Sequence, residues 1–259
     1  ASSSIISTMK AFGIEAKNSM SIVDKFNEVG NNFAITSGGI GDALKRSASA
    51  LSSANNTLDQ SIGMIVAANN VIQDPEVVGT ALKTISMRLR NTSGQLQEMG
   101  IDAEGAAESV TKLQQQLLSL TSGKVNIMKD AETFKSTYEI LVDLSNVWGD
   151  LSDKAQADII RLVAGVRQGN VLTAALSNMK EGIEATNTAL TSQGSALSEN
   201  EKYLSPIKGK VDQFNASLQQ LWANTINSDF VKGLVDGAKA IVLFVDKLGL
   251  IPIILTTIM

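Results

Sequence analysis

Cysteine and histidine are both absent from this 259-residue sequence. Without cysteine, a disulfide framework, a thiolate nucleophile and a cysteine metal site are excluded. The additional lack of histidine removes Ser-His-Asp and Cys-His catalysis, conventional zinc sites and HExxH metallopeptidases. We therefore expect a protein that is not an enzyme, with no catalytic residue, no cofactor and no bound metal.

Proline, aromatic residues and charge are also scarce. The chain has three prolines, 4% aromatic residues and 19% charged residues, against roughly 25% charged residues in an average domain. No run of alternating apolar and polar residues is long enough to predict a sheet. Apolar residues recur instead at steps of three and four, as on one face of a helix. The predicted fold class is all-α, a multi-helix domain of amphipathic helices and helix hairpins that is expected to be part of a longer, largely helical protein.

The charge balance is acidic, with a formal net charge of −4 and an isoelectric point near 5.0. Because affinity for duplexes depends on Lys and Arg that neutralise phosphates, no specific nucleic-acid binding is expected. The short basic run of Lys83, Arg88 and Arg90 lies at the predicted end of a helix. Cations stabilise a helix C-terminus through its dipole, and we expect that role here rather than contact with phosphate.

The sharpest predicted helix start is Asp74-Pro75-Glu76, which combines an N-cap acceptor, a proline at the first helical position and a carboxylate near the dipole. Asn69 interrupts the apolar face of the preceding helix. A buried amide needs hydrogen-bond partners, so Asn69 either sets the helix register or points into a wet groove. The two apolar stripes are Leu58, Ile62, Ile65 and Ile72 before the start, and Val78, Leu82, Ile85 and Leu89 after it.

A glycine cluster precedes a predicted helix over residues 40–51. Glycines before a helix can bind phosphate, but Leu44 stands where a dinucleotide motif needs its third glycine, and no Gly-Lys-Ser/Thr follows. We interpret the cluster as a flexible turn; its members are Gly38, Gly39 and Gly41. Upstream, one helix face is predicted to carry Met20, Val23 and Phe26.

The stretch Val147–Leu172 reads VWGDLSDKAQADIIRLVAGVRQGNVL and predicts a helix hairpin. Ser152 is a suitable N-cap, whereas Gly169 is expected to end this helix and Asn170 to cap the next. The predicted apolar stripe is Leu151, Ala155, Ile159, Leu162 and Val166. The helix that leads into the hairpin is predicted to carry Phe134, Tyr138, Leu141 and Trp148.

A close resemblance to the core of phage tail tape measure proteins is found in the segment WGDLSDKAQADIIRLVAGVRQGNVL, especially in its ending AGVRQGNV. Two further blocks, Met9–Leu51 and Asp74–Arg90, are similar to the same family. They stand in the family's order and are followed by SENEKYLSPIKGKVDQF over Ser198–Phe214. The resemblance therefore covers nearly the whole chain.

This resemblance implies a structural virion protein that sets tail length while the tail tube polymerises, occupies the tube lumen and is released to allow genome ejection. The implied location is the virion, in the tail tube lumen or tail tip, with the host cytoplasm during assembly. The implied partners are sister copies in a cyclic homo-oligomer, expected to be a trimer, the tail tube and tail tip proteins, and the host membrane on ejection.

A heptad-like seam follows Ser205-Pro206, which is predicted to start a helix. Its apolar residues alternate steps of three and four, as in a coiled coil, but span less than three full heptads. The seam is either an oligomer contact or the packing face of an ordinary bundle helix. Its members are Leu204, Ile207, Val211, Phe214, Leu218 and Leu221.

The last twelve residues, Leu248–Met259, are apolar and admit three interpretations: a buried helix, an oligomer interface or the start of a membrane-active segment. A spanning helix needs about 20 apolar residues, so packing is preferred. The candidate interface residues are Leu248, Leu250, Ile251, Ile253, Ile254, Leu255 and Ile258. We divide the chain into a first helical region over 1–125, a hairpin region over 126–200, and a heptad-like helix with the apolar helix over 201–259.

Two other function classes stay open at this point. A membrane-perturbing helical protein of the translocator or pore-forming type is the main alternative, because of the apolar end. A cell-wall hydrolase is a third hypothesis, since paired carboxylates can cleave glycosidic bonds. We interpret the aspartates concerned as solvated residues at caps or on polar helix faces: Asp143, Asp150, Asp153 and Asp158.

Overall fold

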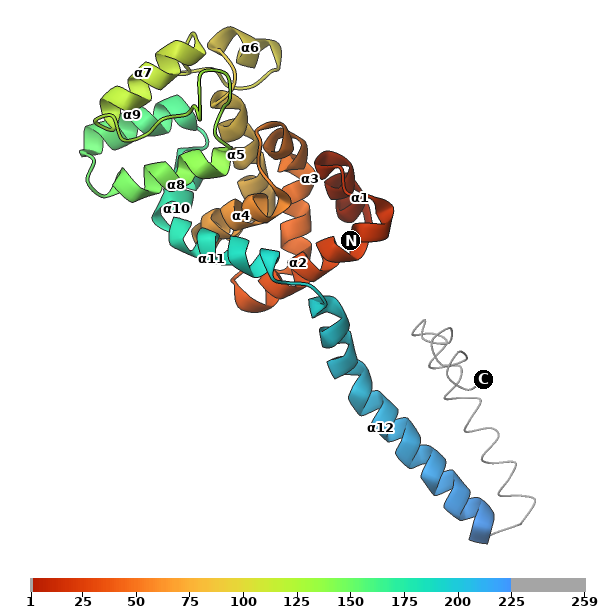
Figure 1. Cartoon of the computed structure of the whole chain (residues 1–259). Helices are drawn as coiled ribbons and strands as arrows, with labels where there is room; N and C mark the ends of the chain where they lie inside the picture. The colour runs from red at the N-terminus through yellow and green to blue at the C-terminus, as the bar shows by residue number, and fades with distance from the viewer. Residues whose placement is uncertain (1, 225–259) are drawn as a thin grey trace. The chain divides into compact units, whose positions relative to one another are not determined.

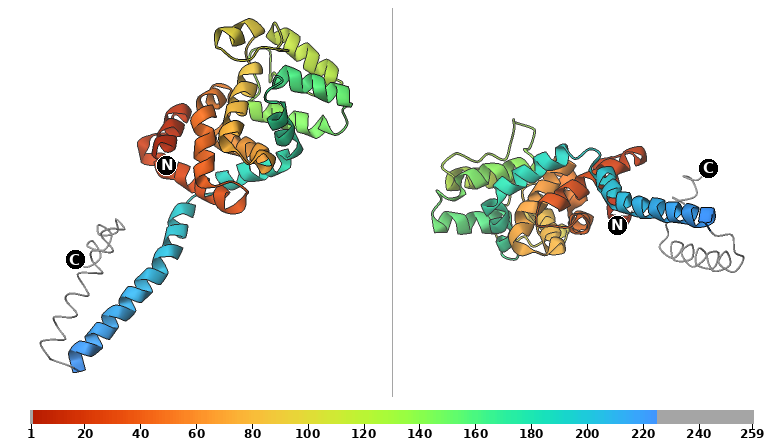
Figure 2. Two further views of the ribbon diagram at one scale, coloured as in Figure 1. Left: turned by 180° about the vertical axis from the view of Figure 1, so that it is seen from behind. Right: turned by 90° about the horizontal axis from the view of Figure 1, so that it is seen from below.

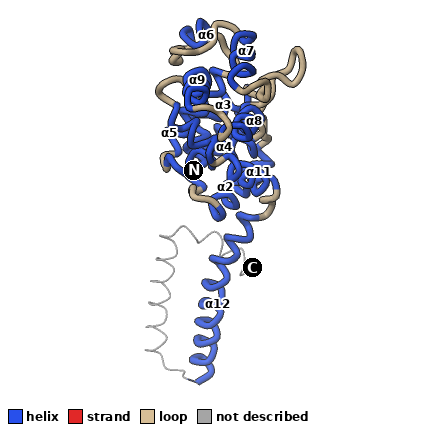
Figure 3. Tube along the Cα trace, turned by 90° about the vertical axis from the view of Figure 1, so that its left-hand side faces the viewer, coloured by secondary structure: helices blue, strands red, loops and turns tan. Residues whose placement is uncertain are grey.

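The structure is a computed structural model that describes residues 2–224. Within that range the chain forms only helices and loops, and the predicted all-α class is confirmed (Figure 1, Figure 3). One isolated antiparallel bridge, between Met128 and Phe134, is the sole extended pairing in the described part. The helices are α1 (Ser2–Phe12), η1 (Ala16–Asn18), α2 (Ser19–Asn32), α3 (Ser37–Ser53), α4 (Leu58–Ile72), α5 (Pro75–Arg88), α6 (Ser93–Glu98), α7 (Val110–Leu120), α8 (Thr137–Trp148), α9 (Asp153–Val163), α10 (Gly169–Ser177), α11 (Met179–Leu190) and α12 (Ser195–Asn224).

The chain divides into two compact units, Ala1–Glu199 and Asn200–Met259. The first unit contains α1 to α11 and the first residues of α12. The described part of the second unit is the remainder of α12, up to Asn224. The predicted boundaries at residues 125 and 200 stay predictions.

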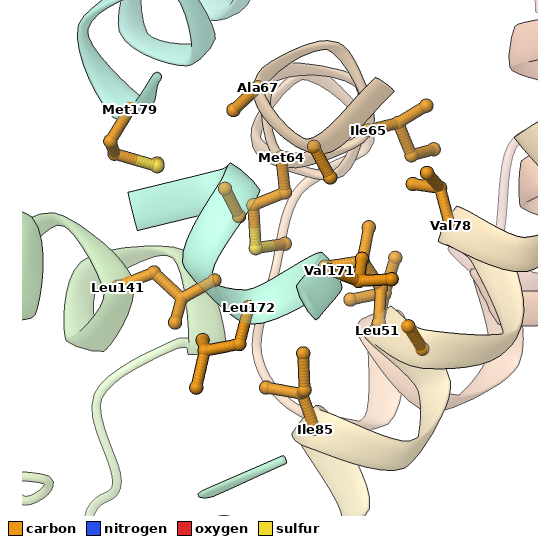
Figure 4. Close-up of a cluster of buried hydrophobic side chains, with 14 of the residues drawn as sticks. Leu51, Met64, Ile65, Ala67, Val78, Ile85, Leu141, Val171, Leu172 and Met179 are labelled. Carbon is orange, nitrogen blue, oxygen red and sulfur yellow. The ribbon is translucent and has the colours of Figure 1, made fainter. Parts of the chain in front are cut away.

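Helix α4 lies at the centre of the first unit and packs against α3, α5, α10 and α11. Helices α1 to α3 gather on one side of it, and α7 to α9 on the other (Figure 1, Figure 2). Buried side chains of α4 and of neighbouring helices gather here, among them Met64, Leu51, Ile85 and Leu172 (Figure 4). Because this core is contiguous, the helices on both sides of α4 belong to one folded unit.

Glycines allow the closest helix crossings in this core. A Cβ atom at Gly63 of α4 would lie 2.3 Å from the carbonyl oxygen of Gly182 in α11. One at Gly79 of α5 would lie 2.3 Å from the carbonyl oxygen of Ala43 in α3. No side chain fits at these distances, so glycine sets how near α4 approaches α11 and α5 approaches α3.

The helix start at Asp74 is confirmed. The carboxylate of Asp74 accepts hydrogen bonds from the amides of Glu76 (3.1 Å) and Val77 (3.2 Å), and Pro75 is the first residue of α5. The predicted stripe Val78, Leu82, Ile85 and Leu89 is fully buried. Asn69 is buried too and donates a hydrogen bond to the carbonyl of Ala34 (3.1 Å), which ties α4 to the segment before α3.

The prediction of a flexible turn at the glycine cluster is wrong. Thr36 caps α3 through the amide of Gly39 (3.0 Å), and all three glycines lie in the first turns of that helix. A Cβ at Gly41 would meet the hydroxyl of Ser4 at 2.7 Å, and one at Gly39 would meet Pro75 at 3.0 Å. The glycines serve close packing of α3 on its neighbours rather than flexibility.

The predicted buried face of α2 is also corrected. Met20 is exposed and Val23 only partly buried, whereas Ile22, Phe26 and Val29 face the core. Ile22, Phe26 and Val29 are separated by four and three residues and so share one face of α2, whereas Met20 and Val23 lie beside that face.

In the hairpin region, Ser152 caps α9 as predicted, through the amide of Ala155 (3.3 Å). The predicted end at Gly169 is wrong, because α9 stops at Val163 and Gly165 takes the left-handed conformation (φ +72°). Gly169 instead is the first residue of α10, so Asn170 lies inside that helix and does not cap it. A Cβ at Gly169 would lie 2.6 Å from the Ile160 side chain, so glycine allows α10 to approach α9 closely. Val166 consequently leaves the apolar stripe and is exposed.

Two further helix boundaries differ from prediction. Phe134 lies before α8, which begins at Thr137 behind a capping box formed by Ser136 and Glu139. Ser205-Pro206 does not start a helix, because Pro206 lies inside the 30-residue α12. That helix begins earlier, at Ser195, where Asp24 of α2 accepts hydrogen bonds from its first amides.

Candidate interaction surface and buried arginines

The apolar seam lies along α12. Leu204 is half-buried, while Ile207, Val211 and Phe214 have exposed fractions of 50%, 45% and 43%. Large apolar side chains exposed at consecutive helical steps form a surface that other apolar groups can cover. The backbone of Leu218 and Leu221 continues the same helix, and their side chains lie outside the description.

The candidate residues of the apolar end lie outside the described residues. These are Leu248, Leu250, Ile251, Ile253, Ile254, Leu255 and Ile258. Among the helices that the structure describes, none combines the length and apolar character required to cross a membrane.

Arg88, at the end of α5, is the largest fully buried side chain described, with an exposed fraction of 2%. Its guanidinium donates to the backbone carbonyls of Arg161 (2.7 Å) and Leu162 (3.3 Å) in the last turn of α9. It also donates to the carbonyls of Asp102 and Glu104 (2.9 Å) in the loop after α6. Four carbonyls from two segments therefore converge on one cation.

The charge of Arg88 is influenced by its burial and by its neighbours. Burial lowers the pKa of Arg88, and the negative charge of Asp102 offsets part of this effect. Gly165 lies against the guanidinium, since a Cβ there would be 3.2 Å from Nη1. The cation neutralises the negative end of the α9 dipole, which is a favourable position for positive charge.

Arg90 makes a second junction of this kind. Its guanidinium lies 4.5 Å from the centre of the Phe134 ring and donates to the carbonyls of Ala54 (2.8 Å) and Lys135. Burial lowers the pKa of Arg90, and Glu139 opposes this shift. The prediction that both arginines stabilise the C-terminus of their own helix is therefore wrong. Both donate hydrogen bonds to backbone carbonyls of other segments. Lys83 remains exposed on α5.

Sequence reasoning missed the burial of Arg88, although a signal was present. Arg88 follows Ile85 by three residues, which places it beside the buried stripe of α5 rather than opposite to it. A cation on that face needs acceptors, and only the folded chain supplies them.

The four aspartates considered for hydrolysis are engaged elsewhere or solvated. Asp143 pairs with Lys135 (2.6 Å) and Asp150 with Lys124 (3.9 Å), while Asp153 and Asp158 are exposed on α9. In residues 2–224 no group of three or more acidic side chains is arranged to hold a metal ion. The features that stand out are thus an exposed apolar seam, and a buried and a half-buried arginine that join segments.

Comparison with known protein families identifies a match. The family model for phage-related minor tail protein matches residues 1–165, which is more than half of the chain. This match includes the blocks Met9–Leu51 and Asp74–Arg90 and the start of the stretch Val147–Leu172, up to residue 165. The rest of that stretch and the block Ser198–Phe214 lie beyond the match. The chain matches no solved structure.

Proposed function

Because this chain belongs to the phage-related minor tail protein family, we propose that it is a tail tape measure protein. The family gives a structural role in the phage tail, and thus a place in the tail of the virion. Our proposal adds that the full protein sets tail length during assembly of the tail tube, occupies the tube lumen and is released to allow genome ejection.

The observation that carries the proposal is the family match together with α12. This helix has 30 residues and an exposed apolar seam. A helix advances about 1.5 Å per residue, so chain length converts directly into physical length. A seam along such a helix offers a surface on which copies can lie side by side.

We further propose that sister copies are joined through this seam, in a trimer. Apolar residues at alternating steps of three and four allow helices to interlock. The tail tube and tail tip proteins are the other proposed partners, and the host membrane is a proposed partner during ejection.

Tail length is the direct test of the ruler. An in-frame deletion in the full gene, outside the segment that encodes these 259 residues, is expected to shorten tails by about 1.5 Å per residue removed. Electron microscopy of assembled particles measures this. A deletion that yields tails of unchanged length would refute the tape measure role, while a family role in the tail would stand.

The seam is tested separately by replacing Ile207 and Val211 with Glu. Charges in the seam are expected to reduce the oligomer to monomers, because like charges would face one another across the contact. Sedimentation equilibrium measures the mass. Ser205→Glu is the control, since Ser205 is exposed on the same helix beside the seam. A monomeric wild-type chain, or an unchanged mass in the double variant, would count against this contact.

A further inference from the structure

One face of α2 holds the start of α12. The carboxylate of Asp24 accepts from the amides of Gly194 and Ala196, each at 3.0 Å. Four residues along, Glu28 accepts from the hydroxyl of Ser195 (2.5 Å), and that hydroxyl accepts from the side-chain amide of Asn27 (2.9 Å). Asp24 itself is buried. A carboxylate at these amides neutralises the positive end of α12, although it comes from a residue 170 positions earlier.

The next residue of α2 holds the end of α11. The ammonium of Lys25 donates to the carbonyl of Ala189 (3.1 Å), in the last turn of α11, and pairs with Asp59 of α4 (2.5 Å). A cation is favourable at this end of a helix. Adjacent residues of opposite charge thus bind the end of one helix and the beginning of the next.

Apolar burial contributes little to this junction. From Leu190 to Asn200 only Ser192 is buried, and Leu190 and Leu197 are exposed. Gly194 has φ +83° and open space where a Cβ would lie. A groove of about 730 Å³ reaches Asp24 and Lys25, bordered by Met20, Leu190 and Gln193. The polar contacts of α2 are therefore the principal attachment, and water has access to them.

We propose that Asp24 and Lys25 form a clasp whose opening releases the first turn of α12 while the core around α4 stays folded. Segments with few buried apolar contacts open at lower free energy than the core they are attached to. The clasp holds Ala189, Gly194 and Ala196 by charge and hydrogen bonds, whereas α3, α4 and α5 are held by contiguous apolar packing. The clasp is a conformational device of the fold, and it stands whether or not the chain is a tape measure.

Hydrogen exchange on the full chain tests the clasp without any substitution. Residues 194–198 are expected to exchange at a rate that low concentrations of urea leave unchanged, because local opening exposes little surface. Exchange in α4 and α5 is expected to accelerate with urea. If residues 194–198 respond to urea with the same slope as α4, the junction opens only with the core and the proposal fails.

Asp24→Ala tests the assignment to this residue. It is expected to speed exchange at residues 194–198 by about tenfold, the loss of one helix cap, with α4 and α5 unchanged. Asp42→Ala is the matched control, since Asp42 is an exposed aspartate on α3. Unchanged exchange at 194–198 in Asp24→Ala would overturn the proposal, and so would an equal acceleration throughout α3 to α5.

A second substitution keeps the test decisive if Asp24→Ala does not fold. Ser195→Ala removes only the hydroxyl that bridges Asn27 and Glu28. It is expected to speed exchange at residues 194–198 in the same direction, with the core unaffected. No acceleration in this variant would show that the α2 face does not hold the start of α12.

Discussion

At the scale of single residues, the buried guanidinium of Arg88 shows how a charge can be kept inside a small helical unit. Its partners are backbone carbonyls, from the loop after α6 and the end of α9. An arginine is suited to this position because its planar fork presents five donors in fixed directions. Lysine has a single ammonium and cannot reach four carbonyls spread around that plane.

Arg88→Lys is therefore expected to lower the free energy of unfolding by about 3 kcal/mol, because buried carbonyls lose their donors while the charge remains. Urea denaturation followed by circular dichroism at 222 nm measures the change. Arg46→Lys serves as the control, since Arg46 is exposed and paired with Glu76; we expect a change within about 0.5 kcal/mol there. Equal effects of the two substitutions would show that the hydrogen bonds of Arg88 add no more to the free energy of unfolding than an exposed ion pair does.

Glu139 gives the molecule an acid-sensitive cap. Burial raises the pKa of Glu139, but hydrogen bonds from the Ser136 amide (2.6 Å) and contact with Lys129 (3.1 Å) outweigh it, so the pKa is lowered overall. A carboxylate with a lowered pKa stabilises the fold above its unfolded pKa, and this contribution is lost as pH falls through the folded value. The free energy of unfolding is thus expected to drop below roughly pH 4.3.

Denaturant titrations at a series of acidic pH values measure this dependence. Glu139→Gln removes the titrating group while it keeps an acceptor for the Ser136 amide. The variant is expected to show a shallower loss of stability over that pH range than wild type. If both proteins lose stability with the same slope, Glu139 is not a source of the acid sensitivity.

At the scale of helices, the crossing of α4 and α11 depends on two glycines. A Cβ at Gly63 would lie 2.1 Å from the hydroxyl of Thr186 and 2.3 Å from the carbonyl of Gly182. The second contact is with backbone, so the helices themselves would have to separate. Because α11 packs on α4 more extensively than on any other helix described, this separation would disturb the core.

Gly63→Ala is expected to lower the free energy of unfolding by about 3 kcal/mol, the upper range for overpacking. Gly94→Ala is the matched control, because Gly94 lies in α6 with open space where a Cβ would be. There we expect a gain of about 0.5 kcal/mol, since alanine favours a helix over glycine. Thermal and urea unfolding of the two variants measure the difference; a stable Gly63→Ala protein would contradict the close crossing.

The same scale shows which parts of the fold the sequence predicts. Helix α5 follows from local signals alone, because Asp74 supplies the cap and Val78 to Leu89 supply the stripe. The glycine cluster was wrongly predicted to be a flexible turn. In sequence, a glycine required for close helix packing cannot be distinguished from one required for a turn. The start of α12 could not be predicted either, because the group that caps it lies on α2, far away in the chain.

The seam as an interaction surface stays a prediction, while its predicted helix start at Ser205-Pro206 is corrected by the structure, where α12 begins at Ser195. The steps of three and four from Leu204 to Leu221 need no tertiary information, and Ile207, Val211 and Phe214 are exposed as an interaction surface requires. The spacing of Arg88 from Ile85 hinted at its burial, but the partners of Arg88 and Asp24 could not be predicted, because charged residues on helices are ordinarily solvated. Their hydrogen bonds depend on carbonyls and amides from distant segments, which come together only in the folded chain.

At the scale of the whole molecule, the apolar core ends before the boundary between the two units. Its buried residues run from Ile22 to Ala189, and the first unit extends to Glu199. A fragment of residues 1–199 would keep every one of these residues, together with the clasp at 194–196. Since cooperativity comes from contiguous burial, this fragment is expected to fold without the remainder.

The fragment is therefore expected to unfold in a single transition, with a midpoint within about 3 °C of the corresponding transition in the full chain. Differential scanning calorimetry of both proteins measures it. A fragment that ends at residue 163 is the contrasting control, because it lacks α10 and α11, which cover α4, and we expect it not to unfold cooperatively. If residues 1–199 instead show no transition, the second unit supplies stability that the core of the first does not contain.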